Sequence, residues 1–479
     1  MAFILHVANL LFTSQLVNPH VPQPYMDEIF HIPQAQQYCG GDYLTWDPKL
    51  TTPPGLYLIS NVIAYVGSLF HVDLCTVNAL RFTNILFSIG LYFVLVSLIS
   101  TLSNKTTSSS WQTSLYALSM SWFPVGFFFN FVYYTDPGST FFVLSCYLLV
   151  KKKHYFLAGI VGLISLTFRQ TNVIWVCLFM MIVIIDTLSA IPKKKEDAKG
   201  LYNPRCSTIT HPGNVLQEFL YYLRINQFFS LSAQVMKSIT SLLLNTLQHF
   251  MIVLPNIVTF LVAIISFAGF LVWNGGIVLG DRSNHMAGLH FPQLFYYTSF
   301  LSFFASPWTF SMHAMTNLLQ LNIKRTLIGI VSAMVTLALI HRYTYEHPFL
   351  LSDNRHYTFY IWKRIYKRHW TVRYLLTPAY YVSGILNLST FAQHTSFLVS
   401  LGYLFALVLT LVPSPLLEFR YFIIPFLFFM VHIPPPTQIS RTLLGLALYL
   451  VIHVVTIYLF LYKPFTWPNE PNATQRFMW

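Results

Sequence analysis

The sequence predicts an all-α protein that crosses its membrane many times, and three observations support this prediction. Of the 479 residues, 55% are hydrophobic and only 9% are charged, whereas soluble domains average about 25% charged residues. Apolar runs close to the length of about 20 residues that spans a bilayer recur along the chain. Lipid offers the backbone no hydrogen bonds, so spans this apolar must be helices. We expect roughly 12–14 spans in a single membrane-embedded domain over residues 1–479.

The expected elements follow one another from the N-terminus. The apolar stretch Phe3–Val17 lacks a basic start and a small-residue cleavage site, so it is expected to be the first span and to be retained. Residues 18–80 form the first large loop, and residues 191–247 form a polar connector. Further apolar runs that approach a full span are Phe87–Leu102, Phe250–Trp273, Leu327–Ile340, Phe397–Val412 and Leu443–Tyr462.

Basic clusters orient these spans. Lys151–Lys153 and Lys193–Lys195 each follow an apolar run closely, and Lys and Arg favour the cytosolic side of a membrane. The connector 191–247 is therefore expected in the cytosol and loop 18–80 on the opposite, luminal face. The net charge of +13 fits basic loops facing anionic lipid better than it fits a nucleic-acid partner.

The cysteines carry little information. They are five in number and scattered, at Cys39, Cys75, Cys146, Cys177 and Cys206. No CxxC pair and no zinc-type spacing occurs among them. We therefore expect neither a disulfide framework nor a metal site.

Scarce carboxylates gather on one face of the membrane. Of the fifteen Asp and Glu residues, most fall in loops or span ends that we expect to be luminal. These are Asp27, Glu28, Asp42, Asp47, Asp73, Asp136, Asp281, Glu346, Asp353 and Glu418. A secondary transporter would usually keep ionisable residues near the bilayer midplane. The asymmetry favours an enzyme or binding protein that works on something in the lumen.

Arginines and histidines accompany these acids in four loops, at residues 25–36, 280–285, 347–357 and 417–421. A carboxylate can take a proton from a hydroxyl, and Arg or His can hold a phosphate and stabilise its charge. Trp and Tyr faces suit sugar rings. The combination is compatible with phosphosugar transfer at a membrane surface. Plainer interpretations remain open: the acids can cap a helix or form ordinary interfacial ion pairs.

Longer motifs resemble a known class of enzymes, the multispanning, lipid-phosphosugar-dependent glycosyltransferases of the GT-C type. Asp27-Glu28 in the first loop, Pro53-Pro54-Gly55 at a helix start and Arg81 near the next span match that class. A closer resemblance covers essentially the whole chain. It is to the endoplasmic-reticulum alpha-1,2-glucosyltransferases that add the last glucose in N-glycan precursor assembly. The runs that carry it are Met26–Gln36, Trp46–Leu58, Phe168–Asn172, Gly280–His285, His347–Tyr360 and Gln475–Trp479.

The resemblance implies an inverting transfer in the membrane of the endoplasmic reticulum, with the active site facing the lumen. The donor would be dolichyl phosphate glucose, and the acceptor the dolichyl-diphosphate oligosaccharide that already carries two glucoses. A beta-linked donor and an alpha-linked product require one base and one face of attack. We predict Asp27 as that base, with Glu28 as the second choice or as its positioning partner.

The remaining site residues are predicted from the same loops. Binding of the donor phosphate or of substrate is expected from Arg282, His285, Asp353, Arg355, His356 and Arg420, and acceptor binding from His31, Gln34, Trp46 and Asp47. No Asp-x-Asp motif is present, so we expect no metal and no cofactor beyond the donor substrate. Two alternatives stay open. One is a related hexosyltransferase with another acceptor, and the other is a transporter or membrane-embedded channel regulator without transferase activity.

Overall fold

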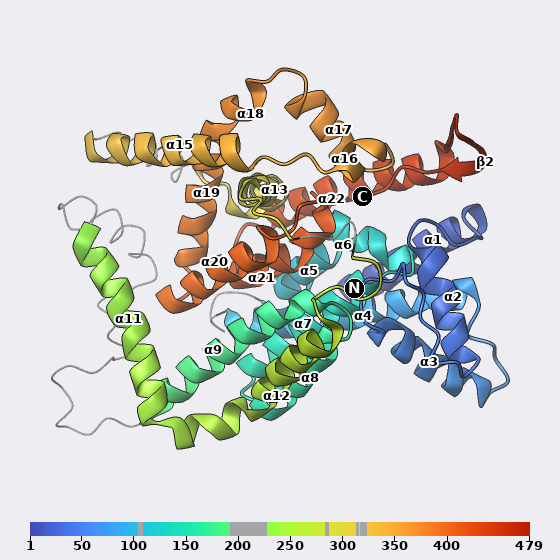
Figure 1. Ribbon diagram of the computed structural model, residues 1–479, viewed down its shortest axis with the longest axis horizontal. Coiled ribbons are helices and arrows are strands. Elements are labelled where there is room, and N and C mark those ends of the chain that lie inside the picture. The colour runs from blue at the N-terminus through green and yellow to red at the C-terminus, as the bar shows by residue number, and fades with distance from the viewer. Residues whose placement is uncertain (104–108, 192–227, 283–286, 313–315, 317–322) are drawn as a thin grey trace.

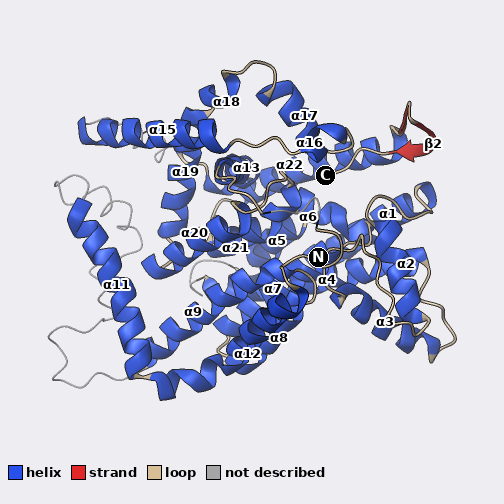
Figure 2. Ribbon diagram, viewed as in Figure 1, coloured by secondary structure: helices blue, strands red, loops and turns tan. Residues whose placement is uncertain are grey.

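The structure, a computed structural model, describes residues 1–103, 109–191, 228–282, 287–312, 316 and 323–479. Helices dominate it (Figures 1 and 2), which confirms the all-α prediction. His285, Lys193–Lys195 and most of the predicted connector lie outside the described residues.

Five helices in the described ranges are long and apolar enough to cross a membrane: Val77–Leu102, Gln170–Ala190, Phe250–Asn274, Thr326–Tyr343 and Ile439–Tyr462. Shorter apolar helices accompany them at Gly55–Ser68, Tyr155–Leu166, Phe397–Leu411 and Phe419–His432. The chain is thus a multi-pass membrane protein. The total of 12–14 spans stays a prediction.

The elements follow in chain order. The first part contains α1 (Ala2–His20), α2 (Glu28–Cys39), α3 (Gly55–Ser68), α4 (Val77–Leu102), α5 (Ser110–Ser121), α6 (Pro124–Phe128), η1 (Phe129–Phe131), α7 (Thr135–Lys151), α8 (Tyr155–Leu166), η2 (Gln170–Asn172) and α9 (Val173–Ala190). The second part contains α11 (Phe228–Gln248), α12 (Phe250–Asn274), α13 (Pro292–Thr309), α15 (Ile323–Tyr343), α16 (Pro348–Ser352), α17 (Tyr357–Ile361), the π-helical turn η4 (Trp362–Tyr366), α18 (Val372–Leu375), α19 (Thr377–Ala392), α20 (Phe397–Leu411), η5 (Phe419–Phe422), α21 (Ile423–His432) and α22 (Ile439–Tyr462). An antiparallel hairpin of β1 (Phe465–Trp467) and β2 (Glu470–Gln475) follows α22.

The helices of the first part pack side by side. Helix α7 contacts α4 and α8, and α12, from the second part of the chain, packs against α8 and α9 (Figure 1). Small residues permit the closest approach: a Cβ added at Gly159 of α8 would collide with the side chain of Thr259 in α12. Small residues serve this purpose in membrane helices generally, because lipid tails are as apolar as the helix faces and close packing must hold the helices together.

An aromatic core joins the two parts of the chain. Phe123, just before α6, stacks on Phe426 of α21 with ring centroids 4.1 Å apart. It also meets Phe304 of α13 edge-on at 5.3 Å. All three side chains are buried. Such stacked and edge-to-face pairs add directional preference to otherwise uniform apolar packing.

Helix α7 separates the acidic and basic ends predicted from the sequence. Asp136 lies in its first turn and Lys151 in its last turn. At 1.5 Å per residue the two are about 22 Å apart along the axis. The structure therefore places this acid and the Lys151–Lys153 cluster at opposite ends of one helix.

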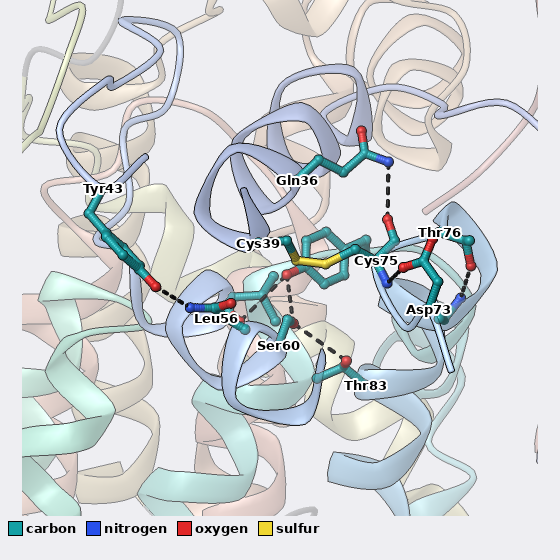
Figure 3. Close-up of a disulfide and its surroundings, with 12 residues drawn as sticks. Gln36, Cys39, Tyr43, Leu56, Ser60, Asp73, Cys75, Thr76 and Thr83 are labelled. Carbon is teal, nitrogen blue, oxygen red and sulfur yellow. Dashed lines mark hydrogen bonds between the residues drawn. A yellow bond between two sulfur atoms is a disulfide. The ribbon is translucent and has the colours of Figure 1, made fainter. Parts of the chain in front are cut away.

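The prediction of no disulfide is wrong for one pair. Cys39, the last residue of α2, is bonded to Cys75 in the loop before α4 (Figure 3). The Gln36 side chain beside it donates to the Cys75 carbonyl at 3.1 Å. The two cysteines are 36 residues apart, so no local spacing indicates the pair. The fold brings them together by packing α2 against α3 and α4.

Candidate active site

A cavity of about 750 Å³ opens where distant segments of the chain converge. We call it the polar cavity. Its lining residues come from the start of α2, the turn before α7, the α16–α17 region, the loop before η5, and the hairpin with the residues after it. They are found at positions 26–27, 129, 134, 349–356, 358–359, 416–420, 467, 469 and 478–479. Three of the four loops predicted to share one face of the membrane therefore meet, at residues 25–36, 347–357 and 417–421, whereas the described residues 280–282 of the fourth loop do not line the cavity.

Asp27 presents a partly exposed carboxylate to this cavity. Its side chain is 43% exposed and pairs with Arg420, with Nη1 and Oδ2 3.3 Å apart. Its backbone N–H donates to the Tyr134 hydroxyl at 3.2 Å. The preceding Met26 has φ +56°, a left-handed conformation that is uncommon outside glycine. This turn lets the chain enter α2 with Asp27 at the cavity.

Glu28 differs completely from its neighbour, because its side chain is fully buried. Its carboxylate accepts from Arg81 Nε at 2.8 Å and Nη2 at 2.6 Å. It also accepts from the backbone N–H of Tyr25 at 3.0 Å and of Tyr133 at 2.6 Å. Arg81 itself is only 1% exposed. The pair thus ties together the loop before α2, helix α4 and the approach to α7.

The loop between α16 and α17 unites three predicted residues. Asp353 pairs with Arg355 at 2.6 Å and lies 3.6 Å from His356 Nε2. Burial raises the pKa of Asp353, but hydrogen bonds from His356 and Arg355 outweigh burial and hold this pKa well below its usual range. Burial lowers the pKa of His356, but Asp353 and Glu418 bring it above its ordinary value. The loop therefore carries both signs of charge.

Arg420 connects Asp27 to a second acid. Its Nε donates to the Glu418 carboxylate, and its guanidinium lies 5.9 Å from the ring centroids of Tyr134 and Tyr421. Burial raises the pKa of Glu418, but the Arg420 charge draws it below its usual range. Arg420 thus stands between two carboxylates at the cavity wall.

Two further charged residues, for which the sequence predicts no site role, extend this network. Arg169 pairs with Asp136 at 2.9 Å and lies 5.8 Å from the Tyr421 ring. Asp136 is one of the acids predicted to be luminal, and Arg169 belongs to the run Phe168–Asn172. Neither pattern indicates that the two residues pair beside Arg420.

Arg282 lies apart from this cluster. Its guanidinium donates to the carbonyl of Asn274, the last residue of α12, and to those of Gly275 and Val278, which follow the helix. It does not line the polar cavity. His285 lies outside the described residues. A role for either in binding the donor phosphate stays a prediction.

The predicted acceptor residues His31, Gln34, Trp46 and Asp47 do not line the cavity either. The His31 imidazole hydrogen-bonds the Tyr57 hydroxyl at 2.5 Å, and burial lowers the pKa of His31 to about 4. Gln34 accepts from the Asp47 N–H at 2.9 Å. These contacts organise the first loop behind Asp27. Contact with the acceptor stays a prediction for all four.

The residues of the polar cavity can remove a proton from one substrate group and bind a phosphate close to it. Asp27 can accept a proton from a hydroxyl that reaches it. Arg420, Arg355 and His356 can hold a phosphate by charge-assisted hydrogen bonds. Within the described ranges no three His, Cys, Asp or Glu side chains gather as metal ligands. That the protein needs no metal or cofactor stays a prediction.

Comparison with known proteins shows that the chain is similar to one protein family over most of its length. The model of the DIE2/ALG10 family matches residues 21–431. A Mus musculus protein named Dol-P-Glc:Glc(2)Man(9)GlcNAc(2)-PP-Dol alpha-1,2-glucosyltransferase is 40% identical, over 99% of this chain and 96% of its own length. Proteins with the same name are 40% identical in Homo sapiens, with the same coverage, and 34% identical in Arabidopsis thaliana, over 97% of both chains. No solved structure matches significantly.

Proposed function

The chain belongs to the DIE2/ALG10 family, and we propose that it is a dolichyl-phosphate-glucose alpha-1,2-glucosyltransferase. It transfers glucose to the dolichyl-diphosphate oligosaccharide that already carries two glucoses, and so adds the third and last glucose of the N-glycan precursor. The observation that carries this proposal is the shared name of relatives up to 40% identical over nearly the whole chain. Nothing in these comparisons favours a transporter or a channel regulator.

The proposed mechanism is a single displacement at the anomeric carbon. Asp27 removes the proton from the acceptor 2-hydroxyl as that oxygen attacks the glucose of the donor. The new carbon–oxygen bond forms on one face while the bond to the phosphate oxygen breaks on the other. The bonding electrons leave with dolichyl phosphate, and the anomeric configuration inverts. The exposure of the Asp27 carboxylate, 43%, suits it to this role.

The leaving phosphate needs charge stabilisation more than protonation. We assign this role to Arg420, with Arg355 and His356, which line the same cavity. Preorganised cations in a site with little water stabilise a developing anion strongly. Glu28 has no free surface and four donors on its carboxylate, so we assign it the positioning of Asp27.

We further propose that the cavity faces the lumen of the endoplasmic reticulum. Disulfides persist in oxidising compartments and are rare in the cytosol. The Cys39–Cys75 bond lies in the same loop as Asp27, at the other end of the short helix α2. In sealed vesicles, this pair is then accessible to a thiol reagent only after permeabilisation and reduction. Labelling from the cytosolic side would overturn the orientation.

The transfer itself is tested with purified protein in lipid nanodiscs. The protein is given dolichyl phosphate glucose and either the diglucosylated or the monoglucosylated acceptor. We expect one hexose to be added to the diglucosylated acceptor, in a bond that an alpha-1,2-specific glucosidase cleaves. Dolichyl phosphate mannose serves as the control donor and should support no transfer. Absence of transfer from the glucose donor would refute the proposed function.

A further inference from the structure

The last residue of β2 and the four residues after it lie along the loop between α16 and α17. We call residues 475–479 the clamp segment. The Met478 N–H donates to the Arg355 carbonyl at 2.8 Å. The His356 imidazole donates through Nδ1 to the Trp479 carbonyl at 2.6 Å. The clamp segment therefore fixes two cavity residues from outside their own loop.

The same segment also reaches the Asp27 side of the cavity. The Arg476 N–H donates to the Tyr25 hydroxyl at 2.7 Å, and that hydroxyl donates to the Arg476 carbonyl at 2.8 Å. The Arg476 guanidinium donates to two backbone carbonyls, each at 2.9 Å. They belong to His20 at the end of α1 and to Phe460 near the end of α22. Because Tyr25 is two residues before Asp27, the clamp segment connects the segment that carries Asp27 to the loop that carries Arg355 and His356.

Trp479 places an indole in the cavity wall. Its ring stacks on Tyr357, with centroids 4.3 Å apart, and lies 6.0 Å from Phe419. Trp467 of β1 also lines the cavity. The Trp479 indole N–H is buried and has no hydrogen-bond partner among the described residues.

We propose that Trp479 is a specificity-determining residue whose indole packs against the terminal glucose of the acceptor. A hexose has apolar C–H faces and a rim of hydroxyls. An indole offers a large rigid face and loses little conformational entropy when it binds. The clamp segment holds this face in the cavity that contains Asp27 and Arg420. The inference rests on the proposed function, because it takes the diglucosylated oligosaccharide as the acceptor.

The test compares Trp479→Ala and Trp479→Phe with a matched control, Trp370→Ala. Trp370 is 68% exposed and lies outside the cavity. We expect Trp479→Ala to raise the KM for the diglucosylated acceptor about tenfold, the size of one aromatic contact. The donor KM should stay unchanged. Trp479→Phe should recover part of the loss, because it keeps a ring against Tyr357.

A second readout separates recognition from support. The preference for the diglucosylated over the monoglucosylated acceptor should fall in Trp479→Ala and stay intact in the control. An unchanged acceptor KM and preference would overturn the proposal. So would an equal rise in both KM values with a lowered Tm in both Trp479 variants, since that pattern describes a structural role. If the unaltered protein transfers no glucose at all, the proposed function fails instead, so the two failures are distinguishable.

Discussion

The buried pair of Glu28 and Arg81 supports the clearest prediction about stability. Glu28→Gln removes the charge that faces Arg81, whose side chain is 1% exposed. The carboxylate accepts four hydrogen bonds, and the glutamine side chain cannot replace them all. Its single oxygen accepts fewer bonds, and its N–H₂ group would face other N–H donors. Removing one partner of a buried ion pair costs about 3–5 kcal/mol. We expect a loss of that size, with Asp27 displaced as the start of α2 loosens.

A matched control is available in the exposed pair of Glu346 and Lys367, whose nitrogen and oxygen are 2.7 Å apart and whose side chains are 35% and 47% exposed. Glu346→Gln should cost less than about 1 kcal/mol. Unfolding followed by tryptophan fluorescence in detergent micelles compares the two variants. The double variant Glu28→Gln with Arg81→Gln should lose less than the sum of its single changes.

If Glu28→Gln were as stable as Glu346→Gln and yet inactive, the positioning role of Glu28 would be refuted. That result would make Glu28 a participant in the chemistry instead of a support for Asp27. Full activity combined with full stability would refute the positioning role as well.

Two more predictions concern the first loop. Cys39→Ser opens a loop with a 36-residue separation, and loss of the crosslink should lower the free energy of unfolding by about 3–4 kcal/mol. Cys39→Ser and Cys75→Ser should lower the Tm equally, because each breaks the same bond. If either variant were as stable as the unaltered protein, this prediction would be wrong. Burial lowers the pKa of His31 to about 4, so the unfolded chain binds a proton that the folded protein rejects. Stability should therefore fall as the pH drops from 6.5 toward 4, by at most about 3 kcal/mol. In a series of unfolding curves at different pH values, His31→Gln should reduce the dependence of the unfolding free energy on pH. An unchanged dependence would show that His31 is not its source.

The sequence predicts much of this architecture because its strongest signals are local. Apolar runs predict helices without knowledge of their neighbours, since a lipid environment allows few other backbone structures. The one-sided distribution of acids likewise predicts that Asp27, Asp353 and Glu418 share a face. The structure adds that they line one cavity together with Arg355, His356 and Arg420.

Other features depend on contacts between distant segments and leave no local pattern. Asp27 and Glu28 are adjacent in sequence, yet one is open to the cavity and the other is buried against Arg81. Tyr25 and Arg476 meet although 451 residues separate them. Arg282 is a residue type that often binds phosphate, but its guanidinium hydrogen-bonds backbone carbonyls just after α12.

The most direct test of this account measures the single-turnover rate of glucose transfer from dolichyl phosphate glucose to the diglucosylated acceptor in Asp27→Asn. The control is Asp42→Asn, an exposed acid of the same loop whose side chain accepts from nearby backbone N–H groups. Loss of a general base should slow Asp27→Asn about 10²–10⁴-fold, with donor affinity and Tm close to those of the unaltered protein, while Asp42→Asn transfers normally. A fully active Asp27→Asn variant would contradict the account.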